Sequence, residues 1–396
     1  MKFSKLVKFL LLFYVISLVI DLTKFGLNGN IQSIIKISLF FLTVLVLIMS
    51  NKKRNFLLFT RNWPFKIYIF ISILSLIYTV DYKETILGLF SLFGALAISS
   101  LTVSYLNYHT IISIVKKASE IIIFGSLIYA QIYPIMAYSF LQGVNRLSGI
   151  TYGTHPLACI SVLLILINTN IFISKLKISL LKLIGLFFLN IPSLLVLYQT
   201  DSRQAQLGLI CSMAILIWSY LKSSQRVLVL TGVLLLSISV FSSSALDGFV
   251  QSQSRGNSDD LYTLTGRVYI WEKAVDIIEQ NAVLGVGFNA GQVVLEANYS
   301  TEFGWTTRSA HNSYLQSALD IGLLGALLIV LWIIKVGLKL IKQKSVFFVS
   351  VLSYVFVVSF VERGFAGSVT IYSFLLILFT FYIEFKKETS LQTYDL

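Results

Sequence analysis

Charge is scarce in this chain, and long polar stretches are scarcer still. Only 12% of its 396 residues are charged, whereas 56% are apolar and the mean hydropathy is +0.83. A soluble domain usually carries about 25% charged residues. Because a water-soluble fold cannot hide this much apolar surface, we expect lipid to surround most of the chain.

Cysteine and histidine are also rare. Cys159 and Cys211 lie inside apolar runs and are interpreted as small core residues rather than as a disulfide or metal pair. The three histidines, His109, His155 and His311, have no zinc-ligand spacing. No Asp-x-Asp pair occurs in a predicted outside loop, so a metal-dependent diphosphate mechanism is not indicated. We expect neither a metal nor another cofactor.

The net charge of +13 does not indicate a nucleic-acid-binding protein. Most lysines lie in short loops between hydrophobic runs, which is the distribution that the positive-inside rule predicts for a membrane protein. The lipid bilayer, and not nucleic acid, is therefore the expected partner of the basic residues.

Twelve hydrophobic runs predict an all-α integral membrane protein with about twelve transmembrane helices. The first run has the basic start of a signal peptide but no small-residue cleavage site, so we expect it to be retained as a helix. The runs cover approximately residues 6–20, 31–49, 65–79, 85–105, 118–136, 155–173, 183–199, 205–221, 227–246, 312–334, 345–361 and 366–383.

This pattern divides the chain into three parts. Residues 1–246 contain nine predicted transmembrane helices, residues 247–311 form one long extracytoplasmic loop, and residues 312–396 contain three further helices and a tail. When the N-terminus is placed in the cytoplasm, every inside segment carries at least two basic residues, so both termini are expected to be cytoplasmic.

Lysine and arginine are distributed differently across this topology. Of 22 lysines, 18 lie on the cytoplasmic side, whereas six of nine arginines lie outside. The arginine guanidinium suits bidentate binding of phosphate or carboxylate, which indicates an anion-binding role. The alternative is pairing with loop acids such as Asp259, Asp260, Glu296 and Glu302. The outside arginines are Arg146, Arg203, Arg255, Arg267, Arg308 and Arg363.

The long loop contains a predicted amphipathic helix in GRVYIWEKAVDIIEQ, with Thr263 or Thr265 as a possible cap. We expect this helix to lie along the outer membrane surface or to pack across the bundle. The glycines of residues 284–291 are interpreted as a turn that returns the chain to the bundle, since no βαβ unit surrounds them. The apolar positions of the predicted amphipathic helix are Val268, Trp271, Ala274, Val275 and Ile278.

His311 stands at the water–membrane boundary, directly before an apolar helix whose N-terminus favours a bound anion. The alternative is an interfacial or helix-capping histidine. Further along that helix, Asp320 is expected to face the bundle interior, and Gly322 and Gly325 to permit close helix packing. His155, which opens the helix predicted over residues 155–173, is expected to line an outer cavity together with His311.

The run from Arg267 through GRVYIW, LGVGFN and HNSYLQSALDIGLLG resembles the bacterial O-antigen ligase and polymerase family. Arg203 to Leu207 fits an Arg-x3-Leu motif, and His311 to Gly322 fits a His-x10-Gly motif, both associated with the ligases. The motif region covers approximately residues 200–330, and the rest of the chain matches only in hydropathy and helix count.

The resemblance implies a metal-independent glycosyltransferase at the periplasmic face of the bacterial inner membrane. The donor would be an undecaprenyl-diphosphate-linked saccharide. Arg203 and Arg267, with Arg308 and Arg146 behind them, would bind its diphosphate, while His311 would be the general base. The acceptor would be lipid A-core in a ligase or a lipid-linked glycan in a polymerase, and the two motif spacings favour the ligase.

Two other classes of protein fit the hydropathy. A polysaccharide or lipid transporter, such as a flippase, would often show internal repeats and buried charges near the midplane. No repeat is evident here, and the polar residues are concentrated in one external loop, which would act as the lid of a lipid-embedded active site. A non-catalytic scaffold for envelope assembly is the third possibility.

Overall fold

The computed structural model describes residues 3–141, 144–174, 180–221, 266–301, 304, 306–365, 367 and 369–392. Within these ranges the chain is almost entirely helical, as predicted, and its strands are limited to one short antiparallel hairpin. The elements are α1 (Phe3–Ser17), η1 (Leu22–Phe25), α2 (Gly29–Met49), η2 (Lys53–Arg61), α3 (Trp63–Leu74), η3 (Ser75–Ile77), α4 (Tyr82–Tyr105), α5 (Tyr108–Ile132), α6 (Pro134–Ala137), β1 (Tyr138–Leu141), β2 (Val144–Leu147), α7 (Thr154–Ser174), α8 (Leu180–Gln199), α9 (Arg203–Tyr220), α13 (Arg267–Gln280), α14 (Gly291–Asn298), α15 (Ser313–Lys342), α16 (Val346–Ser359) and α17 (Ile371–Gln392).

Eleven of the twelve predicted hydrophobic runs contain a helix, and the ninth, 227–246, lies outside the described residues. In the described part, four helices are long and apolar enough to cross a membrane, and three shorter apolar helices accompany them. The all-α membrane class is therefore supported, while the count of twelve spans and the three-part division of the chain stay predictions. The four long spans are Ile31–Met49, Tyr82–Tyr105, Thr154–Ile173 and Ser313–Lys342.

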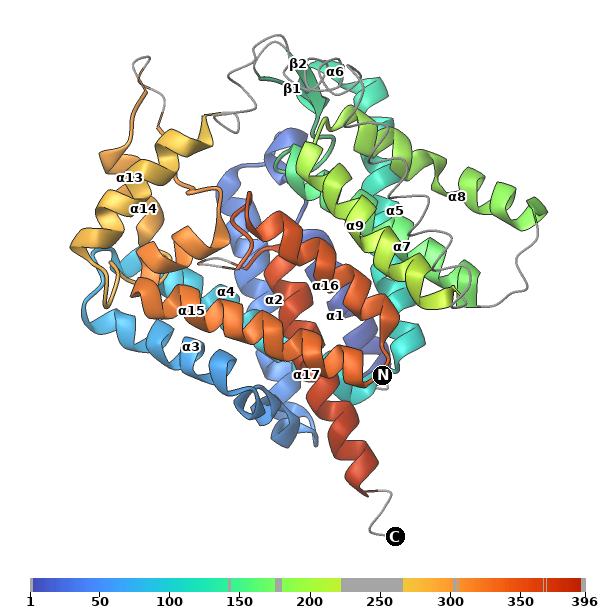
Figure 1. Cartoon of the computed structure of the whole chain (residues 1–396), viewed down its shortest axis with the longest axis horizontal. Helices are drawn as coiled ribbons and strands as arrows, with labels where there is room; N and C mark the ends of the chain where they lie inside the picture. Colours follow the sequence, from blue (N-terminus) through green and yellow to red (C-terminus); the bar gives the residue numbers. More distant parts are fainter. Residues whose placement is uncertain are drawn as a thin grey trace, which may run out of the picture.

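The helices pack into one bundle (Figure 1). Helix α16 lies against α9, α15 lies against α3, and α17 lies against α4. The aromatic rings of Phe65 and Trp332 stack at 3.9 Å between α3 and α15. Helix α2 lies at the margin, since only 22% of its span is buried, and its apolar side chains are suited to lipid contact.

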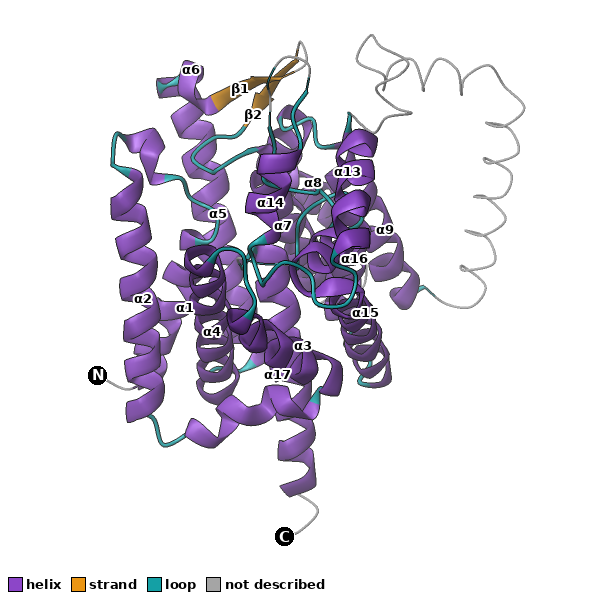
Figure 2. Cartoon of the chain, turned by 90° about the vertical axis from the view of Figure 1, so that its left-hand side faces the viewer, coloured by secondary structure: helices purple, strands orange, loops and turns teal. Residues whose placement is uncertain are grey.

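The two ends of the bundle differ in content (Figure 2). The hairpin of β1 and β2, helix α6 and the start of α13 lie at one end. The basic 3-10 helix η2 and the C-terminal end of α17 lie at the other end. Because the hairpin and α13 come from the predicted outside segments, we refer to their end as the outer end; the side of the membrane that it faces stays a prediction.

Helix α13 confirms the predicted amphipathic helix but corrects its buried face. Its buried residues are Ile270, Ala274, Ile277 and Ile278, so the buried face is rotated from the predicted one, and Val275 is exposed. This face packs on α15, not on lipid. The N-cap is Gly266 in a left-handed conformation, and the predicted cap residues Thr263 and Thr265 lie outside the described residues.

Residues 284–291 form the predicted turn toward the bundle. The backbone amides of Val286 and Gly287 donate to the carbonyls of Leu319 and Asp320, at 2.9 and 2.8 Å. These carbonyls are available because α15 is broken just beyond them, where Gly322 has φ 76° and ψ 179°. Helix α15 covers the hydrophobic run predicted over 312–334, and the kink at Gly322 is a feature that the run did not reveal.

Candidate functional site

The carboxylate of Glu362 is the centre of a polar cluster between α16 and α17. Its oxygen Oε1 lies 3.0 Å from the Arg267 guanidinium, 3.3 Å from Nε2 of His155 and 2.9 Å from the amide nitrogen of Gln204. The Nδ1 atom of His311 lies 3.8 Å from the same oxygen. Four segments far apart in the sequence thus meet at one side chain that is 12% exposed.

Gln204 links the cluster through both ends of its amide group. Its oxygen accepts a hydrogen bond from Arg267 at 3.1 Å, and its nitrogen donates to Nδ1 of His155 at 2.8 Å. With Nδ1 as an acceptor, the neutral form of His155 carries its proton on Nε2, facing Glu362. The network therefore fixes the tautomer of His155 and the orientation of the Arg267 guanidinium.

His311 is brought to Glu362 by the backbone on both sides of the cluster. The hydroxyl of Ser313 donates to the carbonyl of Glu362 at 2.7 Å and accepts from the amide of Gly364, also at 2.7 Å. On the other side, the Trp271 indole donates to the carbonyl of Ala310 at 2.8 Å. His311 itself has φ 46°, a left-handed conformation that only a firmly held segment maintains.

The carboxyl group of Glu362 is held in its charged form. Burial opposes ionisation, but His155, His311 and Arg267 together lower the pKa of Glu362 well below its ordinary value. At 3.8 Å, the Nδ1 of His311 is beyond hydrogen-bond distance, and this buried atom has no hydrogen-bond partner among the described residues. A small inward movement would let His311 donate from Nδ1 to Glu362.

Arg146 and Arg203 lie beside the cluster without contacting Glu362 directly. Arg146, on β2, is 6% exposed, donates from Nε to the carbonyl of Thr200 at 3.0 Å and interacts electrostatically with His155. Arg203 is the half-buried first residue of α9, directly before Gln204. Of the four arginines predicted to bind diphosphate, Arg267, Arg146 and Arg203 therefore lie in or next to one region.

Arg308, the fourth predicted diphosphate ligand, lies in a different ion-pair cluster. Its guanidinium contacts Glu84 at 2.8 Å and Glu296 at 3.2 Å, so two carboxylates already balance its charge. Arg363 joins this second cluster, donating to Gln292 at 2.8 Å and to Asn289 at 2.6 Å. Arg308 therefore pairs with acidic residues, which is the alternative to anion binding that the sequence left open.

Asp320 faces the bundle interior, as predicted. It is fully buried, and its Oδ1 accepts a hydrogen bond from the amide of Gly291 at 3.0 Å. The carboxylate thus holds the start of α14 against α15. This contact gives Asp320 a structural role beside the candidate site.

Sequence reasoning missed Glu362 and Gln204. Glu362 had a readable signal, because an acidic and a basic residue, Glu362 and Arg363, interrupt two hydrophobic runs within a very short outside loop. Gln204 follows Arg203 inside the Arg-x3-Leu pattern but is not one of its defining positions. The described residues include no group of three or more His, Cys, Asp or Glu side chains with metal-binding spacing.

A comparison with protein families finds a match that begins near the middle of the chain. Residues 188–330 match a family model described as "O-Antigen ligase", which covers a little over a third of the chain and includes residues 222–265 outside the described part. Arg203, Gln204, Arg267 and His311 all fall within the matched region, whereas His155 and Glu362 fall outside it. A search of curated proteins found no match.

Proposed function

We propose, for a chain that carries the O-antigen ligase family region over residues 188–330, that the Glu362 cluster is the active site of a membrane glycosyltransferase. The observation that supports this most is the convergence of Arg267, His311, His155 and Gln204 on one buried carboxylate at the outer end of the bundle. The site would transfer a glycan from undecaprenyl diphosphate to an acceptor sugar hydroxyl.

The reaction requires one proton transfer and one displacement. The acceptor hydroxyl gives its proton to Nε2 of His311, and its oxygen forms a bond to the anomeric carbon of the donor sugar. The bond between that carbon and the phosphate oxygen breaks, and its electron pair leaves with the lipid diphosphate. General base catalysis of this kind contributes about 10²–10⁴-fold.

Glu362 would act on His311 as the acid of a triad acts on its histidine. A proton on Nδ1 of His311, directed at Glu362, leaves Nε2 unprotonated for the acceptor. The carboxylate would then stabilise the imidazolium that forms. Glu362 is thus a positioning residue, and the 3.8 Å separation would close when substrate is bound.

The arginines would stabilise the leaving diphosphate. Arg267 is fixed by its bonds to Glu362 and Gln204, so little reorganisation is needed when charge develops on the phosphate oxygens. Arg203 and Arg146 flank the same region and would complete the binding of the diphosphate. Arg308 would contribute only if the diphosphate displaced Glu84 or Glu296.

The acceptor distinguishes the two forms of this activity. We favour a ligase that uses lipid A-core as the acceptor, because both motif spacings fit the ligases. The alternative is a polymerase that extends a lipid-linked repeat unit. In a deletion strain, bare core with accumulating lipid-linked glycan would identify the ligase, whereas lipopolysaccharide with a single repeat would identify the polymerase.

Reconstitution tests the proposed function directly. Purified protein in lipid nanodiscs, given lipid-linked glycan and acceptor, should form product without ATP or an ion gradient. His311→Ala should reduce turnover by about 10²–10⁴-fold, and Arg203→Ala should also reduce it. His109→Ala is the matched control, because His109 lies at the start of α5 and stacks edge-on against Tyr108, away from the cluster.

Full turnover in both His311→Ala and Arg203→Ala would contradict the site assignment and would favour a scaffold. Movement of intact lipid-linked glycan between leaflets, without any new glycosidic bond, would favour a transporter instead.

A further inference from the structure

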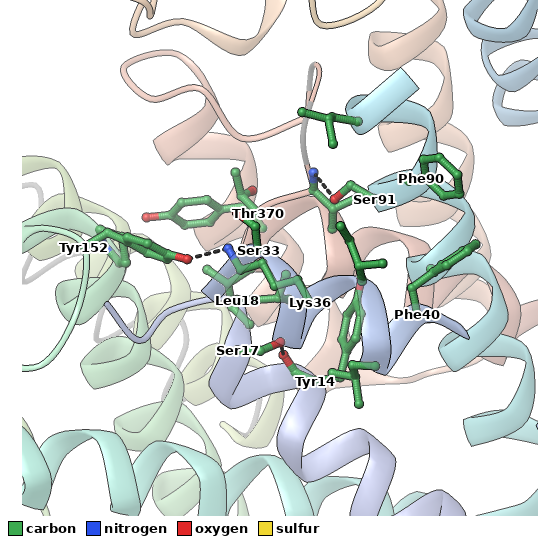
Figure 3. Close-up of a pocket in the computed structure, with 18 of the residues that line it drawn as sticks. Tyr14, Ser17, Leu18, Ser33, Lys36, Phe40, Phe90, Ser91, Tyr152 and Thr370 are labelled. Atoms are coloured by element: carbon green, nitrogen blue, oxygen red, sulfur yellow. Dashed lines mark hydrogen bonds between the residues drawn. The ribbon is translucent and has the colours of Figure 1, made fainter. Parts of the chain in front are cut away.

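A cavity of about 500 Å³ lies beside the Glu362 cluster, between α1, α2, α4 and the start of α17. Figure 3 shows Phe40 and Phe90 on one side of this cavity and Tyr152 directed toward Lys36 on the other. None of the arginines assigned above to the diphosphate, namely Arg146, Arg203, Arg267 and Arg308, lines it. The cavity therefore borders the predicted diphosphate site without including those four arginines, although Arg363 lines it.

Exposed apolar side chains of α2 and α4, two candidate membrane spans, form part of the cavity lining. Ile37 on α2 and Leu87 and Phe90 on α4 line the cavity, and each of these side chains is 44% exposed. In a membrane these side chains contact lipid. A hydrocarbon chain can thus pass from the bilayer into the cavity without crossing water.

The positively charged side chain of Lys36 lies in the lining of this largely apolar cavity. Lys36 lies within the α2 span, where an ionisable side chain is costly and usually has a function. Its ammonium group donates to the hydroxyl of Tyr152 and lies 4.7 Å from the centre of the Tyr152 ring. Within the described residues, no carboxylate lies within salt-bridge distance of Lys36, and Asp21 acts on it only at longer range.

Tyr152 adds a hydrogen-bond donor next to this cation. Lys36 and Gln32 both donate to its oxygen, which leaves the hydroxyl hydrogen for a further acceptor. Burial, followed by the charge of Asp21, raises the pKa of Tyr152 to about 12, so the hydroxyl stays protonated at neutral pH. An ammonium group and a hydroxyl beside an apolar channel complement a phosphorylated lipid.

The far wall of the cavity leads to the reaction centre. His155 and Glu362 belong both to this wall and to the polar cluster, and Glu362 also approaches His311. The headgroup of a lipid in the cavity would therefore lie close to His155 and Glu362, on a wall to which Arg363 also belongs.

We propose that this cavity binds the acceptor substrate, as a phosphorylated long-chain lipid that enters between α2 and α4 and places its phosphate at Lys36 and Tyr152. The assignment as the acceptor rests on the proposed function, whereas the binding of the lipid does not. The volume lies within the range of about 300–1,000 Å³ of ligand pockets, enough for a head region and the first carbons of the chain.

Photocrosslinking tests the site independently of turnover. The probe is a monophosphorylated lipid A with a diazirine near the start of one acyl chain, added to the full-length protein in phosphatidylcholine nanodiscs. Peptide mass spectrometry should find the label on α2 and α4. Leu87→Trp, which narrows the opening, and Lys36→Gln, which removes the cation, should each reduce labelling at least fivefold.

Two neighbouring variants serve as controls. Ile86→Trp adds the same bulk on α4 at a position with 42% exposure that does not line the cavity. Lys83→Gln removes an exposed lysine from the first turn of the same helix. Both should keep the labelling of the wild type, and size-exclusion chromatography should show all four variants folded. Labelling that neither Leu87→Trp nor Lys36→Gln changes would overturn the lipid site.

Kinetics then test the acceptor assignment. Leu87→Trp should raise the KM for the acceptor at least fivefold while the KM for the donor stays unchanged. A raised donor KM, or equal competition from phosphatidylglycerol at the same mole fraction, would overturn this assignment. Absence of any transfer in the wild type, together with the expected labelling pattern, would reject the proposed function and leave the lipid site standing.

Discussion

Glu362 is the residue on which the candidate site depends. Burying a carboxylate is costly, and this cost is offset only because Arg267, Gln204 and two histidines surround it. Replacing the Glu362 carboxylate with a neutral group would leave the largely buried Arg267 guanidinium with a weaker hydrogen-bond acceptor. One acidic side chain thus brings together an arginine, two histidines and a glutamine from four segments.

We predict that Glu362→Gln lowers turnover by about 10- to 100-fold. Hydrogen bonds to charged groups contribute about 1.5–3 kcal/mol, and the neutral amide gives up this contribution to His311 and Arg267. The measurement is steady-state transfer in nanodiscs. Asp276→Asn is the control, since Asp276 is 60% exposed on α13 and pairs only with Lys273. Equal losses in the two variants would argue against a positioning role for Glu362.

The lowered pKa of Glu362 gives a second prediction at this scale. A carboxylate with a lowered folded-state pKa stabilises the protein above the unfolded pKa, about 4.3, and loses this contribution as the pH falls through the folded value. The difference in Tm between the wild type and Glu362→Gln should therefore be constant from pH 8 to about 5 and shrink below about 4.3. A difference that already shrinks between pH 7 and 5 would contradict the lowered pKa.

The sequence allowed some of these residues to be nominated and not others. Helix ends on the outer side could be located from hydropathy, so Arg203, Arg267 and His311 could be singled out by position and chemistry. The convergence on Glu362 could not, because it depends on how α7, α9, α13 and the α16–α17 link pack in three dimensions. The pairing of Arg308 with Glu84, more than 200 residues away, was hidden for the same reason.

At the scale of elements, α15 shows how a break in a helix supports the site. The break at Gly322 frees backbone groups for the turn at residues 284–291, and Leu323 donates to the carbonyl of Ala282 at 2.8 Å. This pairing holds the end of α13 to α15, and α13 carries Arg267. The kink therefore contributes to the position of a proposed diphosphate ligand.

We predict that Gly322→Ala destabilises the protein. The backbone conformation at Gly322 is accessible almost only to glycine and costs other residues about 1–3 kcal/mol. An added Cβ would also lie 2.2 Å from the carbonyl oxygen of Val283. The measurement is Tm in detergent together with turnover, and both should fall.

Gly337→Ala is the matched control on the same helix. A Cβ at Gly337 would meet only Leu352, at an ordinary 3.4 Å, and alanine favours a helix interior by about 1 kcal/mol over glycine. Its Tm should be unchanged or higher. Equal Tm values for the two variants would show that the kink is not a structural requirement.

Hydropathy located most elements because the helices in this chain are selected for contact with lipid, and apolar runs mark them directly. The kink and the buried face of α13 were harder to predict. Position 322 in a run of apolar residues gives no sign that the turn at residues 284–291 will dock there. The packing of α13 on α15 selects Ile270 and Ile277 for burial, although Trp271 and Val275 fit the helical spacing equally well.

For the whole molecule, the separation of lysine from arginine has a physical explanation in the two ends of the bundle. Helix η2 and the end of α17 carry basic residues of the predicted cytoplasmic side (Figure 2), as the positive-inside rule expects. Arg146, Arg203 and Arg267 lie at or near the other end, in or beside the Glu362 cluster. A phosphorylated lipid reaching that cluster would come from the outer leaflet.

This arrangement predicts the orientation of the chain. In a variant with Cys159 and Cys211 replaced by serine, a cysteine at Glu279 on α13 should react with a membrane-impermeant maleimide in intact spheroplasts. A cysteine at Lys344, in the turn after α15, should react only after permeabilisation, because that lysine-rich turn is expected in the cytoplasm. Both positions are exposed, so accessibility alone does not separate them. The opposite labelling pattern would put the Glu362 cluster on the cytoplasmic face, where an extracytoplasmic transfer reaction could not use it.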